Sequence, residues 1–293
     1  MGKIAVITDS NTCLPDEILQ RYQIEIVPIA LIFGDEILRD GIDIDIPGFY
    51  ARLRTADPLP TTSSPTPAQF IEIFQAAKSK GVDCIVVVTL SSKLSMSYNT
   101  AQIAVADMEG FPIRVVDSRM ATIAQGFVAL TAAEAATQGL ALDDVASLAE
   151  KSTADIGFAV MLDTLEYLHR GGRVPAIASL IGSAVQLTPV VGNRGDGTVG
   201  IIAPTFGQKS AMERVLKEVE QRAKGRQLKR LAVMHADALE RAKSLMEIVE
   251  ERFACDEIYL VELTPVMGAH AGPGVVGLAF QIENPSLAYS GEA

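Results

Sequence analysis

Hydroxyl-bearing side chains follow two apolar runs of the chain in clusters larger than a turn requires. Leu59-Pro60 leads into Thr61-Thr62-Ser63-Ser64, and Cys84–Val88 leads into a loop that contains Ser91-Ser92-Lys93-Leu94-Ser95. A helix cap needs a single hydroxyl, so capping explains only part of each cluster. Where parallel strands end beside helix N-termini, free backbone N–H groups and the helix dipole favour negative charge. Together the clusters predict a hydroxyl-lined pocket for a small anionic group.

A glycine-rich segment and an isolated arginine add two further candidates. The segment Gly268–Gly274 has the sequence GAHAGPG, which predicts a constrained loop that holds His270. His270 is then either a ligand contact or an ordinary loop residue. A predicted helix ends at Gly171-Gly172, where Arg170 complements the helix dipole. Arg173 lies beyond that break, where a guanidinium could pair with a carboxylate or a phosphate.

Conventional catalytic motifs are absent from the sequence. It contains no G-x-S-x-G elbow, no Walker loop and no H-E-x-x-H pair, and its three histidines are scattered, so we expect no metal site and no cofactor. One enzyme hypothesis remains open. Ser95 and His270 could form a nucleophile–base pair, oriented by Asp9 or Asp117, for acyl transfer or acyl hydrolysis. The two Asp-Ser pairs that contain these acids, 9–10 and 117–118, are either turns and caps or ligand contacts.

Composition excludes several other classes of protein. The net charge of −11 argues against nucleic acid or an anionic membrane surface as partner. The chain enters a predicted strand directly rather than a signal peptide, and no apolar run is long enough to span a bilayer. The three cysteines are far apart and odd in number, which suits a reducing compartment. We therefore expect a globular cytoplasmic protein.

Alternating strand and helix patterns predict parallel β-α-β units in the first half of the chain. The expected strands are 3–8, 24–33, 84–89 and 113–117; the expected helices are 15–22, 67–80, one ending near Met108, one ending near Thr137, and 143–152. A hairpin signal at Gly195-Asp196-Gly197 predicts antiparallel pairing in the second half. Its expected strands are 157–161, 188–192, 198–203, 230–235, 257–262 and 275–282, with helices at 208–224 and 238–253. We predict two α/β domains, 1–155 and 156–293, with a cleft between them.

An ordered set of motifs along nearly the whole chain resembles the DegV family of bacterial fatty-acid-binding proteins. In the first half the motifs are ITDS with LP at 7–15, RDG at 39–41, PTTS at 60–63, SSKLS at 91–95 and VDS at 116–118. In the second half they are TLEYL at 164–168, GGR at 171–173, DG at 196–197, GAH at 268–270 and GPG at 272–274. No single motif is specific enough, but the ordered set is.

The resemblance implies a DegV-like α/β fold. Its N-terminal domain holds a mostly parallel sheet with flanking helices, its C-terminal domain holds a mixed sheet, and a long-chain fatty acid such as palmitate is buried between them. It further implies that the loop after Pro60 and Ser95 with the adjacent backbone hold the carboxylate. His270 is implied to lie nearby. The residues so implicated are Thr61, Thr62, Ser63, Ser95, Met96 and His270.

Related proteins present the acid to a separate fatty acid kinase, which makes an acyl phosphate for phospholipid synthesis. The resemblance therefore implies a lipid carrier rather than an enzyme, with Arg173 as a contact for phosphate or for the kinase. The chain departs from the family pattern at four sites. Met96-Ser97 stands where Gly-Thr is usual, Cys13 replaces a frequent acid, Ala271 a frequent threonine, and Thr188 a frequent lysine.

Overall fold

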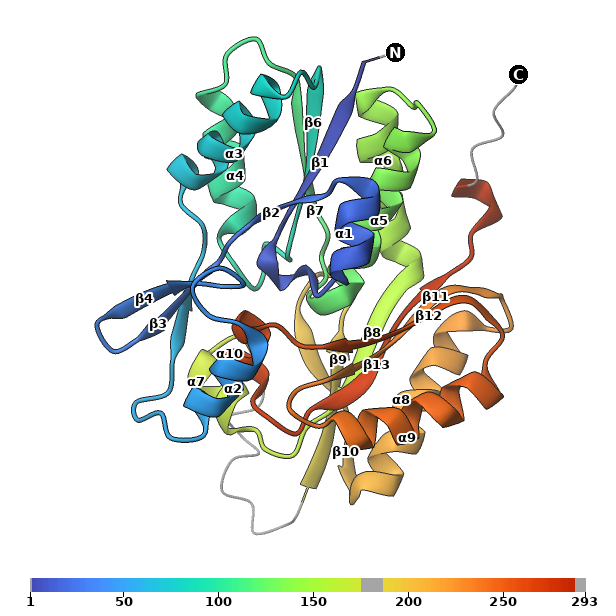
Figure 1. Ribbon diagram of the computed structural model, residues 1–293. Coiled ribbons are helices and arrows are strands. Elements are labelled where there is room, and N and C mark those ends of the chain that lie inside the picture. Colours follow the sequence, from blue (N-terminus) through green and yellow to red (C-terminus); the bar gives the residue numbers. More distant parts are fainter. Residues whose placement is uncertain (1, 175–186, 288–293) are drawn as a thin grey trace.

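The computed structural model describes residues 2–174 and 187–287, and its first half is built on a four-stranded parallel sheet (Figure 1). The strand order is β2-β1-β6-β7, and each neighbouring pair is parallel. The strands are β1 (Ile4–Asp9), β2 (Glu25–Val27), β6 (Cys84–Thr89) and β7 (Ile113–Asp117). This confirms the expected parallel arrangement of the N-terminal half.

Helices cover both faces of this sheet, which explains why β6 is buried along its whole length. On one face, α3 (Pro67–Ser79) and α4 (Ser97–Ala106) pack against Ala5, Ile7 and Ile85. On the other face, α5 (Thr122–Thr137) and α6 (Leu142–Ser152) pack against Val6 and Val86. The short helix α1 (Asp16–Tyr22) follows β1, as its sequence predicted.

The second half forms a six-stranded mixed sheet in the order β10-β9-β8-β13-β11-β12. Strands β11 and β12 are parallel, whereas the other neighbouring pairs are antiparallel. The strands are β8 (Ile156–Met161), β9 (Leu187–Asn193), β10 (Val199–Phe206), β11 (Leu228–His235), β12 (Cys255–Glu262) and β13 (Val276–Ile282). This confirms the predicted mixed sheet and the predicted hairpin between β9 and β10.

Helices cover one face of the mixed sheet, and the other face packs against the first half of the chain. Helices α8 (Gln208–Ala223) and α9 (Leu239–Arg252) bury one face around Val215, Leu245 and Phe280. The other face joins the core of the first half, since one hydrophobic cluster contains both Phe127 of α5 and Phe158 of β8. The chain passes between the halves through η2 (Thr153–Asp155), next to the predicted domain boundary at residue 155. That boundary stays a prediction.

A third, small sheet was not expected, and it corrects the prediction of one strand over 24–33. The segment breaks at Pro28, which has no N–H to donate to a ladder. β2 stays in the parallel sheet, whereas β3 (Ala30–Phe33) pairs with β4 (Glu36–Arg39) and β5 (Thr61–Ser63). The residues Thr61–Ser63 are thus a strand rather than the predicted loop. Helix α2 (Ile46–Leu53), capped by Asp45, was also missed.

A second correction concerns His270, which lies on a helix and not on the predicted constrained loop. Helix α10 (Pro265–Ala271) begins with proline at its first position, where the missing N–H costs nothing. It ends at Gly272, whose φ of +75° suits glycine. Helix α7 (Glu166–Gly171) packs nearby and ends at Gly172 in the left-handed conformation, as the Gly-Gly break predicted. Two short 3-10 turns, η1 (Ser10–Thr12) and η4 (Pro285–Leu287), complete the described elements.

Candidate functional site

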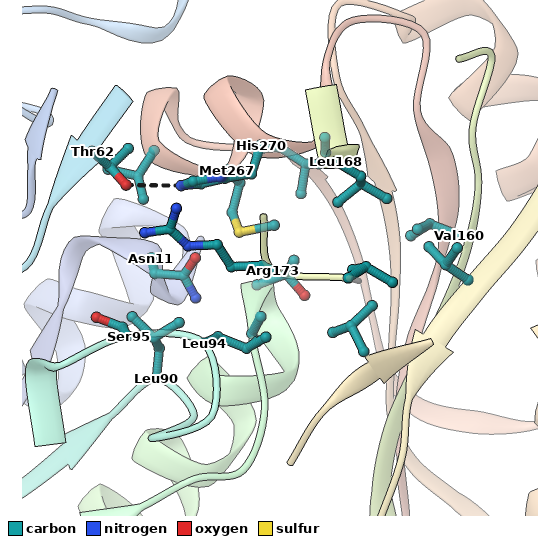
Figure 2. Close-up of a pocket in the computed structure, with 18 of the residues that line it drawn as sticks. Asn11, Thr62, Leu90, Leu94, Ser95, Val160, Leu168, Arg173, Met267 and His270 are labelled. Atoms are coloured by element: carbon teal, nitrogen blue, oxygen red, sulfur yellow. Dashed lines mark hydrogen bonds between the residues drawn. The ribbon is translucent and has the colours of Figure 1, made fainter. Parts of the chain in front are cut away.

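A narrow cavity lies between the two large sheets and is lined from both halves of the chain (Figure 2). The centre of a water-sized sphere can occupy about 90 Å³ within it. One ordered water needs roughly 10–15 Å³ on the same measure, so the cavity holds more than a single water. Most of the wall is apolar; it includes Ile29, Leu90, Leu94, Phe158, Val160, Leu162, Leu168, Val191, Val199, Val266, Met267 and Val275. Such a lining suits an apolar ligand.

Thr62 and His270 meet at the polar part of this wall. The Thr62 hydroxyl and His270 Nε2 are 2.8 Å apart, joining β5 to α10 across 208 residues of sequence. Alternation along β5 decides which hydroxyl takes part, because successive side chains of a strand point to opposite faces. Thr62 lies opposite Leu31 and lines the cavity, whereas Thr61 and Ser63 are exposed and do not line it. Of the three predicted residues of this segment, the structure brings only Thr62 to the cavity.

Ser95 lies beside Ser64 in the same polar region. The hydroxyls of Ser64 and Ser95 are 2.7 Å apart, and those of Ser95 and Ser97 are 2.9 Å apart. Met96 is 56% exposed, and its backbone N–H donates to the Ser64 hydroxyl. Ser64 lines the cavity but was not among the predicted site residues. Its position in the run of four hydroxyls was the available signal.

Arg173 extends toward Thr62 and His270 (Figure 2). Its guanidinium donates to the carbonyl of Gly171, and its side chain lines the cavity. The same arginine also lines a groove on the outer surface together with Ser63, Lys93 and Met96. Cavity and groove share Thr62, Ser64, Leu94, Ser95 and Arg173, so the polar end of the cavity adjoins the surface.

The imidazole of His270 is held in its neutral form. Burial, and to a lesser extent the positive charge of Arg173, together lower its pKa from 6.5 to about 4. Its Nδ1 is buried and has no hydrogen-bond partner within the described part of the chain. Gly171 permits this packing, because a Cβ there would lie 2.6 Å from Nδ1. A neutral imidazole can donate one N–H without adding a charge.

The His270 imidazole should therefore titrate near pH 4 in the ligand-free protein. The unfolded chain binds this proton at about pH 6.5, so its contribution to stability is complete above that pH and is lost as pH falls toward 4. Titration of the histidine Cε1 protons by NMR, assigned with His270→Gln, measures it. Arg173→Gln removes the neighbouring charge and should raise the pKa. A titration near 6.5 in the parent protein would contradict this burial.

The predicted Ser95–His270 pair does not form in the structure. His270 Nε2 is hydrogen-bonded to the Thr62 hydroxyl. The Ser95 hydroxyl is instead hydrogen-bonded to the hydroxyls of Ser64 and Ser97. Neither candidate acid orients the histidine. Asp9 accepts hydrogen bonds from Gln125 and from the Leu90 and Asn11 amides, and Asp117 accepts from Ser92 and the Arg119 amide. The geometry thus lacks the nucleophile–base contact of a serine hydrolase.

The part of the chain that the structure describes offers neither a metal-ligand cluster nor a helix suited to span a membrane. Within residues 2–174 and 187–287, no group of three His, Cys, Asp or Glu side chains is placed to hold a metal ion. In the same ranges, no helix combines the length and apolar character needed to cross a bilayer. Two departures from the family pattern are also located. Ala271 lines the cavity, whereas Thr188 lies on β9 outside it.

The fold and the site define an α/β protein with a narrow apolar cavity between two sheets and a polar end formed by hydroxyl, imidazole and guanidinium groups. The profile of the DegV family, described as uncharacterised proteins, matches residues 3–283. The chain belongs to the DegV family. A DegV domain-containing protein of Streptomyces coelicolor is 34% identical over 276 residues, covering 94% of this chain and 97% of its own length. One from Listeria innocua is 31% identical over 281 residues, with 96% and 99% covered.

Solved structures share the whole fold. A DegV family protein from Thermus thermophilus, described by its fatty acid binding, superposes with a TM-score of 0.87 at 28% identity, covering 96% of this chain and all of its own. DegV from Bacillus subtilis, described as a fatty acid binding protein, gives a TM-score of 0.86 at 29% identity, with 97% and 100% covered. The DegV-like fold predicted from the sequence is confirmed.

Proposed function

We propose that this protein binds a long-chain fatty acid such as palmitate, with its chain in the cavity and its carboxylate at the polar end. The observation that carries the proposal is a narrow apolar cavity that ends at Thr62, Ser95, His270 and Arg173. An alkyl chain matches the walls and an anionic head group matches the end. The fatty acid binding described for the relatives from Thermus thermophilus and Bacillus subtilis supports the assignment.

The polar end offers a carboxylate complementary donors. The hydroxyls of Thr62 and Ser95 can turn to donate, and neutral His270 can donate one N–H. The Arg173 guanidinium supplies positive charge beside them. Of the other predicted contacts, the Met96 amide already donates to Ser64, and Thr61 and Ser63 are exposed. We therefore assign the carboxylate to Thr62, Ser95, His270 and Arg173.

The protein then acts as a cytoplasmic carrier for a separate fatty acid kinase that converts the bound acid to an acyl phosphate. The outer groove supports this role, because it shares residues with the polar end and adds the cation Lys93. A kinase seated there would reach the head group while the chain stays buried.

The first experiment is denaturing extraction of freshly purified protein, followed by mass spectrometry of the released molecules. A near-stoichiometric long-chain fatty acid is the expected result. An empty protein that also fails to take up added fatty acids would refute the proposal.

Ser95→Ala should impair phosphorylation of the bound acid more than binding. Loss of one hydrogen bond costs about 0.5–1.5 kcal/mol, so palmitate affinity should fall by no more than about tenfold. A carboxylate misplaced by about 1 Å should in addition slow phosphoryl transfer by about 10²-fold relative to the parent protein. Acyl phosphate formation by the cognate kinase, at saturating palmitate, measures it.

Thr61→Ala is the matched control, since Thr61 lies in the same hydroxyl run but is exposed and lines neither the cavity nor the outer groove. It should leave both affinity and phosphorylation near their original values. Unchanged phosphorylation in Ser95→Ala would remove Ser95 from the head-group site.

The alternative is an acyl-transferring or acyl-hydrolysing enzyme that uses Ser95 and His270. The absence of a bond between these two side chains and the lowered pKa of His270 both weigh against it, because a base near pKa 4 abstracts a hydroxyl proton poorly at neutral pH. Turnover of an acyl ester or acyl phosphate by the pure protein would favour the enzyme. Loss of that turnover in Ser95→Ala would then be required.

A further inference from the structure

Two polar side chains line the apolar cavity and are not needed for the carboxylate. Asn11 of η1 is 0% exposed and Thr122 of α5 is 2% exposed, and both lie in the cavity wall. Asn11 Oδ1 and Thr122 Oγ1 have no hydrogen-bond partner among the residues that the structure describes. Buried polar atoms are nearly always paired, so two unpaired atoms on one ligand cavity call for an explanation.

A chain of hydrogen bonds fixes which atom of Asn11 is left unpaired. Asp9 accepts hydrogen bonds from the backbone amides of Leu90 and Asn11, and its carboxylate also accepts from Gln125 Nε2 at 2.9 Å. Gln125 Nε2 further donates to the Thr8 hydroxyl at 3.0 Å. With both its donors engaged, Gln125 presents its Oε1, which accepts from Asn11 Nδ2 at 2.8 Å. Asn11 therefore keeps a free acceptor, Oδ1.

Thr122 lines the same cavity as this acceptor. Thr122 is the first residue of α5, three positions before Gln125, which accepts the hydrogen bond from Asn11. Thr122 has a φ of +60°, which is rare for a β-branched residue. Such backbone strain is maintained only where the surrounding structure enforces it, and it gathers at functional sites. A hydroxyl and an amide oxygen, both without a partner among the described residues, thus belong to the wall of one largely apolar cavity.

A plain alkyl chain would leave both atoms unpaired and desolvated. A chain that carries a hydroxyl group would donate to Asn11 Oδ1 and accept from Thr122 Oγ1. Sites with a buried polar group discriminate strongly against analogues that lack the matching hydroxyl, because the group is then left unpaired. We propose that the preferred ligand of this cavity is a hydroxylated long-chain fatty acid, whose hydroxyl is bound by Asn11 and Thr122.

The proposal deepens the proposed function and depends on it. Its test compares matched pairs of acids on delipidated protein: 2-hydroxypalmitate and 3-hydroxypalmitate against palmitate, and 12-hydroxystearate against stearate. At least one hydroxy acid should bind about tenfold or more tightly than its parent. Asn11→Leu should reduce the ratio of the two affinities, hydroxy acid over parent acid, to near one. The parent acid itself should bind at least as tightly as before. A merely structural role for Asn11 would lower both affinities together.

Thr122 offers the cleaner second variant, because its hydroxyl makes no bond to the described residues that a substitution could break. Thr122→Val removes the hydroxyl and should lower the ratio, whereas Thr122→Ser keeps it and should preserve the ratio. Equal binding of every hydroxy acid and its parent would overturn the inference, as would a ratio that survives in both Asn11→Leu and Thr122→Val. Failure of all the acids to bind would instead refute the fatty acid function itself.

Discussion

Palmitate should bind this protein about 6 kcal/mol more tightly than octanoate. The longer acid has eight further methylenes, and each contributes about 0.8 kcal/mol when it is buried in an apolar site. The walls of the cavity consist mainly of apolar side chains from both halves of the chain, which is where those methylenes would be buried. Calorimetric or displacement titration of the even-numbered acids from eight to sixteen carbons would give the slope of binding free energy against chain length.

The slope should be the same in Ser95→Ala, because that substitution alters the head-group end and not the walls. Affinity that does not change with chain length would contradict burial of the chain in this cavity. Affinity that stops rising at a certain length would mark the end of the available space.

Glu134→Gln should lower the free energy of unfolding by about 2–3 kcal/mol. Arg230 is 0% exposed, and its guanidinium is bonded to Glu134, Glu257 and Gln281. Without the Glu134 carboxylate, the buried guanidinium keeps Glu257, whose side chain is 42% exposed, as its carboxylate partner among the described residues, so its charge is only partly compensated. Chemical denaturation at pH 7 measures the loss.

Arg230→Met is the informative companion, because it removes the buried charge and keeps an apolar side chain. Glu134 retains Lys229, and Glu257 is partly exposed, so both acids stay solvated or paired. The loss in Arg230→Met should therefore be smaller than in Glu134→Gln. Glu213→Gln, in an exposed pair with Arg252, should cost less than about 1 kcal/mol. A larger loss in Arg230→Met than in Glu134→Gln would contradict the argument.

This ion network also matters for the cavity. Glu134 lies on α5 of the first half, whereas Arg230, Glu257 and Gln281 lie on three neighbouring strands of the mixed sheet. Gln281 additionally donates to Thr131 on the same helix. The network therefore fastens α5 to the second sheet. Since the same helix begins at Thr122 in the cavity wall, its position determines part of the ligand site.

The sequence could identify the elements whose evidence is local. Thr66 and Gln69 form the capping box that starts α3, and Gly195-Asp196-Gly197 lies between the antiparallel strands β9 and β10. Short-range signals of this kind depend on hydrogen bonds within a few residues. The segment from Ile24 to Phe33 shows the limit. Its apolar pattern is continuous, but Pro28 divides it between two sheets, and sheet membership depends on distant strands.

The sequence by itself determined the family, the α/β class and the chemistry available at the site, because these depend on residue types and local order. Only the tertiary structure decided which hydroxyls face the cavity. Thr62 lines it while Thr61 and Ser63 do not, because β5 pairs with β3 about thirty residues earlier and so fixes which face is buried. His270 contacts Thr62 rather than Ser95 because α10 packs beside that strand. Packing between segments that are about thirty residues apart in one case and 208 in the other sets these contacts, and local sequence does not encode it.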